Sequence, residues 1–225
     1  MSGFFITGTD TEIGKTIVAE AITHILVNSG LQVATMKPVA SGGVWQADGL
    51  RNDDAEALMA QANCGLNYDD INPYCFEPAI APHIAAQQCD VEIELERILQ
   101  AFQIQRQVSE CIVVEGVGGW LVPLSARFNV ADMAVAMGLP VILVVGMRLG
   151  CINHALLSVK AIQEAGCQLV GWVANFNQGG YSVDDENVDT LLSAIQAPLL
   201  GRIPFIPTGQ VQDVAEHLDV KRLLP

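Results

Sequence analysis

The sequence predicts an α/β protein with a mainly parallel sheet and helices on both of its faces. Apolar segments alternate with amphipathic segments along the 225 residues, which is the pattern of strands that alternate with crossover helices. The two most apolar segments, residues 111–115 and 141–145, show no polar alternation, as is typical of parallel strands covered on both faces. No linker-like stretch interrupts the pattern, so we expect a single domain over residues 1–225.

The first half of the chain contains two expected strands, at residues 4–7 and 33–39. A helix is expected between them, over residues 15–28. Two more helices are expected over residues 53–62 and 92–105, the second with apolar residues near helical spacing.

The second half continues the alternation after the two apolar strands. We expect a helix at 152–164, a strand at 169–175, a helix at 183–195 and a last strand at 198–203. Residues 67–82 contain three prolines and are predicted to form a long ordered loop rather than a domain boundary.

The strand ends predict where a ligand binds. Parallel strands with right-handed crossovers place ligand sites at their carboxyl ends. We therefore expect the residues that follow six positions to converge on one site: Thr7, Val39, Val114, Val145, Ala174 and Ile203.

The charge balance excludes some classes of partner. The chain has 11 basic and 25 acidic side chains, a formal net charge of −14, and only 16% charged against 51% hydrophobic residues. Binding to nucleic acid or to an anionic membrane depends on clustered Lys and Arg, so we expect neither partner. The longest clean apolar stretch, residues 140–145, is far shorter than the about 20 residues of a spanning helix. We expect a soluble, cytoplasmic protein.

The six cysteines show no disulfide or metal-binding spacing. They lie at positions 64, 75, 89, 111, 151 and 167, with no C-x-x-C pair, and the four histidines are equally scattered. We expect buried or half-buried reduced thiols, because Cys behaves as a small hydrophobe in protein cores.

A phosphate-binding loop follows the first predicted strand. Residues 8–16 read GTDTEIGKT and lead into an apolar helix. Glycines let backbone N–H groups face phosphate oxygens, Lys15 would neutralise the β- and γ-phosphates, and Thr16 would bind Mg²⁺. Five residues separate the first glycine from Gly14-Lys15, one more than in the usual motif. This variant P-loop predicts nucleoside triphosphate binding; the alternative is an ordinary strand-to-helix turn with Lys15 in solvent.

Two carboxylates are candidates to hold the metal ion. Glu115 ends an apolar strand and is followed by the glycine-rich residues GVGG, while Asp54 lies at a predicted helix start. Asp54 alone could be an N-terminal cap, a role for which Asp53 competes. The hard oxygen ligands of Thr16, Asp54 and Glu115 suit Mg²⁺.

A second lysine lies at the end of the second predicted strand. Lys37 is one of few lysines in the chain, and lysine is seldom buried without a partner. We expect Lys37 to be held by an anion; the alternative is a surface charge at a sheet edge.

Taken together, these motifs resemble the dethiobiotin synthetases of biotin biosynthesis, over nearly the whole chain. The resemblance rests on GTDTE at 8–12 with GKT at 14–16, KPVASG at 37–42, RN at 51–52 with Asp54, VEG at 114–116 with GGW at 118–120, LGCINHA at 149–155 and GWVAN at 171–175. The five-residue spacer of the phosphate loop is itself typical of that family. The resemblance implies an ATP-dependent cyclo-ligase that closes a ureido ring on 7,8-diaminopelargonic acid with CO₂, through a carbamate and a carbamoyl-phosphate-type mixed anhydride, releasing ADP and phosphate.

The resemblance also implies roles for individual residues. Lys15 would bind the phosphates, Lys37 the carbamate and the transferring phosphoryl group, and Thr11 and Ser41 would hydrogen-bond the carbamate or the substrate amines. The ATP-binding residues would be Glu12, Ile13, Gly14, Lys15, Thr16, Ile17, Asp54, Glu115, Gly116, Val117, Gly118, Asn175, Phe176, Pro204, Phe205 and Ile206.

A helix start is expected to hold the far carboxylate of the substrate. Free N–H groups at the start of the helix near Gly150, Cys151 and Asn153 form an anion site. In the resembled family this helix start comes from the partner subunit of a homodimer. The alternative is a monomer in which Asn153 caps the helix.

The sequence departs from the family pattern at two positions. The resemblance implies that adenine lies over Asn175 and near Pro204 and Phe205. Phe176 follows Asn175 where a polar residue is more familiar, which affects these contacts. Ala81 precedes Pro82 and His83 where Ser is expected. We expect His83 to be structural, because no acid–base partner is adjacent in sequence.

Three other classes compete with this interpretation. A regulatory P-loop ATPase of the partitioning type would use nucleotide as a dimerisation switch, but such proteins carry a lysine five positions before the loop lysine, and Asp10 stands there. An amidating enzyme of the same superfamily would need a glutamine-hydrolysing domain, for which the chain is short. A binding-only protein is disfavoured because both lysines, Thr16 and both carboxylates are present.

Overall fold

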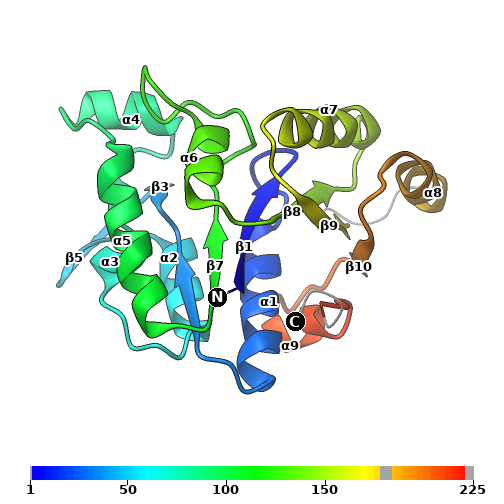
Figure 1. The fold of residues 1–225 in the computed structure, drawn as a ribbon, viewed down its shortest axis with the longest axis horizontal. Helices are drawn as coiled ribbons and strands as arrows, with labels where there is room; N and C mark the ends of the chain where they lie inside the picture. Colours follow the sequence, from blue (N-terminus) through cyan, green and yellow to red (C-terminus); the bar gives the residue numbers. More distant parts are fainter. Residues whose placement is uncertain (1, 178–183, 221–225) are drawn as a thin grey trace.

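The computed structural model of the protein, which describes residues 2–177 and 184–220, is built on a six-stranded parallel sheet (Figure 1). The strand order is β10-β9-β8-β1-β7-β2, with β1 (Ser2–Gly8), β2 (Val33–Met36), β7 (Cys111–Glu115), β8 (Val141–Gly146), β9 (Leu169–Asn175) and β10 (Leu199–Ile203). The predicted α/β class with a parallel sheet is confirmed.

The two faces of the sheet belong to two separate apolar cores. Phe4 and Ile6 pack with α1 (Lys15–Asn28), α9 (Val211–Ala215) and Leu58 of α2 (Asp53–Gln61). Phe5 points to the other face, where the helices are α4 (Pro82–Gln88), α5 (Leu95–Val108), α6 (Val130–Met137), α7 (Cys151–Glu164) and α8 (Asp184–Ala194). Successive strand side chains point to opposite faces, so strands buried on both sides must be apolar throughout.

Most of the predicted helices and central strands are found where expected. The helix α1 has the predicted bounds, and β7, β8, β9 and β10 agree within one residue. The helix predicted over 92–105 is shifted by three residues, to Leu95–Val108, and the backbone N–H of its N-cap Glu94 donates to the Tyr74 hydroxyl (2.9 Å). Of the helix predicted over 183–195, Val183 lies outside the described residues.

The strand predicted over residues 33–39 is wrong as a single element. The sheet strand β2 ends at Met36, and a separate strand β3 (Val39–Ser41) pairs with β6 (Tyr74–Phe76). The backbone N–H of Lys37 donates to Ile71 O (2.9 Å) instead of to the sheet, and Pro38 has no N–H to donate. The strand of the main sheet therefore ends directly before Lys37, one of the two lysines predicted to be functional.

The loop predicted over residues 67–82 is also wrong. It contains α3 (Tyr68–Ile71), the strand β6 and the first residue of α4, where Pro82 suits the first helical position. A hairpin of β4 (Val44–Gln46) and β5 (Gly49–Arg51), and the helices α6 and α9, were not predicted either. Elements of three to eight residues are too short for their periodicity to be visible in the sequence.

Two further expectations concern membranes and thiols. In the described part of the chain, no helix combines the length and apolar character needed to cross a membrane. All six cysteines are free, two of them buried and three half-buried. Cys89 is exposed, so the expected burial is wrong for this one residue.

Candidate active site

Three of the six predicted strand ends, those after Thr7, Val39 and Val114, converge on a cavity of about 650 Å³ at the carboxyl edge of the sheet, whereas the residues after Val145, Ala174 and Ile203 do not line it. Its lining includes residues from the ends of β1, β2, β3 and β7 and from the start of α2. Lys15, Lys37, Ser41, Asp54 and Glu115 all face this space. Side chains separated by up to a hundred positions in sequence therefore meet in one place.

The phosphate loop is held in a conformation that only glycine adopts easily. Gly14, the N-cap of α1, has φ 82°, and a Cβ atom there would collide with the amide nitrogen of Asn175. Asn175 donates from that nitrogen to Ile13 O (2.7 Å). The ammonium of Lys15 donates to Asp10 O (2.7 Å), and the residue is 6% exposed. The alternative of a solvated Lys15 is therefore wrong.

Four side chains, two of them buried, form one polar cluster beside the loop. The Nζ atom of Lys37 lies 2.6 Å from Glu115 Oε1 and 2.8 Å from Asp54 Oδ2. The Thr16 hydroxyl lies 2.9 Å from Asp54 Oδ1 and 3.0 Å from Glu115 Oε1. Lys37 is 3% exposed and Glu115 1%, so the expectation that anions hold Lys37 is confirmed, and its alternative as a surface charge is wrong.

The start of α2 shows which residue caps the helix. The side-chain oxygen of Asn52 accepts from the N–H of Ala55 (3.3 Å), which makes Asn52 the N-cap. Neither Asp53 nor Asp54 has that role, and the capping alternative is wrong. The Asp54 carboxylate instead points to Lys37 and Thr16.

The cluster shifts the pKa values of its members in different directions. Burial by itself would lower the pKa of Lys37, but the charges of Glu115 and Asp54 outweigh it and raise that pKa. Burial raises the pKa of Glu115, an effect that Lys37 partly offsets. The pKa of Asp54 is lowered because Lys37 outweighs the burial of this carboxyl. Burial, together with the charge of Lys37, lowers the pKa of Lys15 to about 8.

Two buried oxygen atoms at the cavity have no hydrogen-bond partner among the described residues. They are Ser41 Oγ and Glu115 Oε2. A buried polar atom without a partner is costly, so both are positions where a ligand atom would be stabilised. The loop residues Thr11 and Glu12 also line the cavity, and Glu12 has φ 56°.

Other predicted residues lie away from this cavity. Gly150, Cys151 and Asn153 form the start of α7 and are not part of its lining. Gly150 is the N-cap, so Asn153 does not cap this helix in the way that the monomer alternative expected. Asn175 and Phe176 lie at the end of β9, and Pro204, Phe205 and Ile206 follow β10, where Phe176 N donates to Ile203 O (2.9 Å). The carboxyl ends of β9 and β10 are therefore adjacent.

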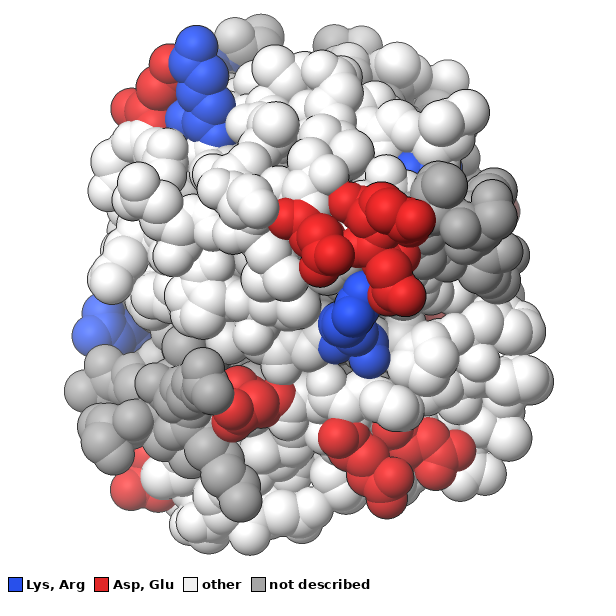
Figure 2. All heavy atoms as spheres, turned by 90° about the vertical axis from the view of Figure 1, so that its right-hand side faces the viewer, with Lys and Arg blue, Asp and Glu red and all other residues white. Residues whose placement is uncertain are grey.

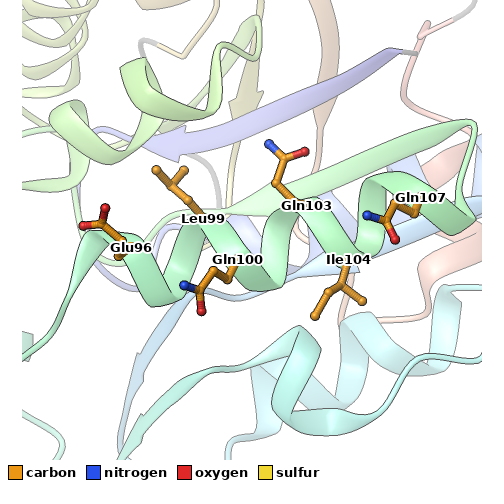
Figure 3. A pocket seen from close by; sticks show the side chains of 6 residues that line it. All are labelled: Glu96, Leu99, Gln100, Gln103, Ile104 and Gln107. Atoms are coloured by element: carbon orange, nitrogen blue, oxygen red, sulfur yellow. The ribbon is translucent and has the colours of Figure 1, made fainter.

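A second hollow of about 440 Å³ lies along α5 (Figure 3). Its lining comes from one helix and consists of Glu96, Leu99, Gln100, Gln103, Ile104 and Gln107. It brings together no pair of opposite charges. The clustered lysines and carboxylates make the cavity at the strand ends the candidate active site.

Several residues at the site have no role in the sequence-based prediction. Asn52 could have been identified as a helix cap, because it precedes an acidic first turn. Tyr68 and Asn72 hydrogen-bond to each other and to the backbones of Asn52 and Lys37, but they lie in the segment predicted to be a loop. Arg148, which forms an ion pair with Asp10, follows a strand with no signal of its own.

Comparisons with known proteins give three findings. The family model of the AAA domain matches residues 2–211. The chain is 49% identical over 224 residues, 99% of this chain and 98% of the relative, to the ATP-dependent dethiobiotin synthetase BioD of Pseudomonas paraeruginosa. It is 44% identical to the protein of the same name from Aeromonas salmonicida, with both chains covered completely.

Solved structures with the same fold are distant in sequence. The MinC:MinD cell division complex of Aquifex aeolicus has a TM-score of 0.55 at 13% identity, covering 100% of this chain and 90% of the other. A ParA family ATPase from Chlorobium tepidum has a TM-score of 0.55 at 12% identity, with 100% and 93% covered. This likeness shows the P-loop fold alone.

Proposed function

The chain belongs to the ATP-dependent dethiobiotin synthetase family, and on that basis we propose that it uses ATP to close a ureido ring on 7,8-diaminopelargonic acid with CO₂. The products are dethiobiotin, ADP and phosphate. One observation carries the proposal from the structure: two buried lysines, a hydroxyl and two carboxylates converge on one cavity. Carbamate and triphosphate are both anions, so their reaction would be stabilised by the two lysines together with a metal ion held by the hydroxyl and the carboxylates.

The phosphate loop would bind the triphosphate of ATP. Lys15 already donates to a backbone carbonyl within the loop, so its ammonium lies where a phosphate oxygen can replace that acceptor. The start of α1 adds backbone N–H donors. The residues that we assign to phosphate binding are Glu12, Ile13, Gly14, Lys15, Thr16 and Ile17, together with the glycine-rich turn of Gly116, Val117 and Gly118.

The adenine would lie where β9 and β10 end. Asn175, Phe176, Pro204, Phe205 and Ile206 are the proposed contacts. The Asn175 amide holds the phosphate loop through one N–H, which leaves its second N–H and its carbonyl for a base. Phe205 is 55% exposed and offers an aromatic surface there.

Thr16, Asp54 and Glu115 fit a magnesium ion. All three supply hard oxygen donors, and Glu115 Oε2 is buried without a partner. Three or more His, Cys, Asp or Glu side chains do not cluster as a metal site anywhere in the described residues, which suits an ion that also takes phosphate and water oxygens. When bound, Mg²⁺ would neutralise charge on the β- and γ-phosphates.

Lys37 would stabilise the reacting anions. One amine of the substrate adds to CO₂ and loses a proton to give a carbamate, and a carbamate oxygen attacks the γ-phosphorus as the bond to ADP breaks. The second amine then attacks the carbamoyl carbon and phosphate leaves. Two of the three N–H bonds of Lys37 face carboxylates, which leaves one for the carbamate and the transferring phosphoryl group. Ser41 Oγ, which is buried and unpartnered, and Thr11 would orient the carbamate and the amines.

The far carboxylate of the substrate would bind at the start of α7 of a partner subunit in a homodimer. Gly150, Cys151 and Asn153 do not line the cavity of their own chain. The same segment carries large exposed apolar side chains, with Leu149 94% and Leu157 60% exposed. Apolar surface of this kind favours burial against another chain.

The cellular setting and domain organisation are part of the proposal. We propose that the protein is cytoplasmic, because the reaction consumes ATP. The family match over residues 2–211 and the near-complete coverage of the relatives support one domain over residues 1–225.

A regulatory ATPase of the partitioning type is the alternative, and only distant fold neighbours support it. In this chain Asp10, at the position of the extra lysine of that class, forms an ion pair with Arg148. Phosphate release from ATP and Mg²⁺, measured with and without the diamine and bicarbonate, separates the two functions. A switch ATPase would show no stimulation by the diamine.

The Lys37→Ala variant tests the assignment of the reacting centre. We expect ring closure to fall at least about a hundredfold because the charge that faces the developing anions is lost. ATP should still bind, as measured by calorimetry without Mg²⁺, because Lys15 remains. The Arg127→Ala variant is the control, since it removes one positive charge that is 83% exposed in its side chain. Near-normal turnover by Lys37→Ala would refute the assignment.

A further inference from the structure

A chain of buried hydrogen bonds runs behind the cavity, from the start of α2 to Lys37. The hydroxyl of Tyr68 accepts from the backbone N–H of Asn52 (2.7 Å) and donates to Asn72 Oδ1 (3.0 Å). The amide nitrogen of Asn72 donates to Lys37 O (2.6 Å) and to Tyr74 O (3.1 Å). Asn52, Tyr68 and Asn72 are 7%, 9% and 3% exposed. We call Tyr68 and Asn72 the rear relay.

Both backbone polar groups of Lys37 are bound by the same short segment. Its N–H donates to Ile71 O (2.9 Å), and its carbonyl accepts from Asn72. This segment therefore replaces the neighbouring strand that would otherwise bind residue 37. The position of the Lys37 backbone is set by α3 and its end, outside the main sheet.

The start of α2 and the residue after β2 are also joined inside the cavity, on the side opposite to the rear relay. There the ammonium of Lys37 contacts the carboxylate of Asp54 (2.8 Å), which lies two residues after Asn52. The Asp54 side chain is 43% exposed, so this contact alone holds it weakly. Thr35 of β2 also donates to Leu58 O of α2 (3.0 Å), but the rear relay is the buried link that reaches the start of α2 at Asn52 and the backbone of Lys37.

We propose that Tyr68 and Asn72 are positioning residues for the reaction, which hold Asp54 at the metal site and Lys37 at the reacting anions in register. This inference rests on the proposed function. Neither residue lines the cavity, so each acts through the residues that it holds. Donors and acceptors run in one direction along the relay, an arrangement in which hydrogen bonds strengthen one another.

Tyr74 offers a matched control within the same region. Its hydroxyl is also a buried acceptor, for the backbone N–H of Glu94 (2.9 Å), and the residue is 4% exposed. That N–H begins α5, a helix that contributes no residue to the cavity. Tyr68→Phe and Tyr74→Phe therefore both remove a hydroxyl that accepts from a backbone N–H at a helix start, and only Tyr68→Phe also removes the donor to Asn72.

The Tyr68→Phe variant should remove the relay without removing the ring. The Arg51 guanidinium lies 4.1 Å from the centroid of the Tyr68 ring, and phenylalanine keeps that cation–π contact. We expect affinity for ATP in the presence of Mg²⁺, measured by calorimetry, to fall about tenfold or more, as for other residues that support metal ligands. Affinity without Mg²⁺ should stay within about twofold, because Lys15 and the phosphate loop are untouched.

Turnover supplies the second measurement. We expect kcat of Tyr68→Phe to fall about tenfold or more, while Tyr74→Phe stays within about twofold of the parent. Each variant leaves one backbone N–H without its acceptor, and Tyr68→Phe should lose somewhat more thermal stability because it also leaves the buried Asn72 Oδ1 without its donor. If both variants behave alike in Mg²⁺-dependent binding, or if only Tyr68→Phe fails to fold, the relay is merely structural and the proposal is wrong.

The Asn72→Asp variant tests the other half of the relay. A carboxylate keeps an acceptor for the Tyr68 hydroxyl but loses the donor to Lys37 O. We expect the same loss of kcat, and a smaller loss of Mg²⁺-dependent ATP affinity than in Tyr68→Phe; unchanged kcat would overturn the role assigned to Asn72. The binding measurements need no diamine, so they test the relay even if the parent protein fails to form dethiobiotin, which would refute the proposed function instead.

Discussion

Lys15 and Lys37 carry the same charge in different electrostatic surroundings. Lys37 is paired with two carboxylates, which raise its pKa. Lys15 donates to a neutral carbonyl oxygen, and burial with the nearby Lys37 lowers its pKa to about 8. A triphosphate would supply the negative charge that Lys15 lacks in the free protein, so ligand binding and protonation of this residue are linked.

We expect ATP binding to take up a proton in alkaline solution. Above about pH 8 free Lys15 is mostly neutral and bound Lys15 is charged, so affinity should fall as pH rises, by at most about tenfold per unit. Calorimetry in buffers of different ionisation enthalpy should show uptake approaching one proton at about pH 9 and little at about pH 7. In Lys15→Arg the guanidinium stays charged and the uptake should vanish. Equal uptake by both proteins would contradict this assignment.

At the scale of elements, the phosphate loop is tied to the segment that leads into α7. Thr9 N donates to Val144 O (3.0 Å), and Gly146 N donates to the Thr9 hydroxyl (3.3 Å). Asp10 adds the ion pair with Arg148. Three consecutive contacts therefore link the nucleotide loop to the turn before Gly150, where we place the anion site for the substrate carboxylate.

The Arg148→Met variant tests whether this ion pair orients the start of α7. The pair is partly exposed, so its loss should raise KM for the diamine by about two- to fivefold, the range of exposed ion pairs. Asp10→Asn should act similarly, and the double variant should be no worse than either single change, because both remove one interaction. Arg127→Met is the control. Additive effects in the double variant would show that the two residues act independently.

At the scale of the whole molecule, charge and apolar surface define what the protein can bind. On the face seen in Figure 2, the basic side chains among the described residues are isolated between acidic groups and uncharged surface, in keeping with the net charge of −14. Lys15 and Lys37 instead lie inside the cavity, whose lining also includes Glu12, Asp53, Asp54 and Glu115. A small anion that enters the cavity can contact these two lysines, whereas a polyanion meets an acidic surface.

Mixed dimers test whether the site is shared between subunits. Lys37→Ala destroys the site of its own chain, and Asn153→Asp should repel the substrate carboxylate at the partner's site. Each homodimer should be inactive, but random exchange of subunits makes half of the dimers mixed, each with one intact site, so activity should recover to about a quarter of the parent. Light scattering should give about twice the 24.1 kDa chain mass. A mixture as inactive as its components would exclude the shared site.

The sequence by itself determined the fold class, the central strands and the phosphate loop. These features depend on local patterns: strands buried on both faces must be apolar throughout, and a loop that binds phosphate needs glycines at fixed positions before a helix. The bounds of α1 could be predicted because the phosphate loop marks its start and Gly30, with φ 90°, follows its end.

Only the tertiary structure decided how the site is held together. Lys37 meets Asp54 across 17 positions and Glu115 across 78, and no local pattern encodes such pairings. The break of β2 at Met36 and the elements within residues 67–82 escaped prediction for the same reason. Their backbone groups bind partners that are distant in sequence, so Tyr68 and Asn72 acquire their part in the site only when the chain is folded.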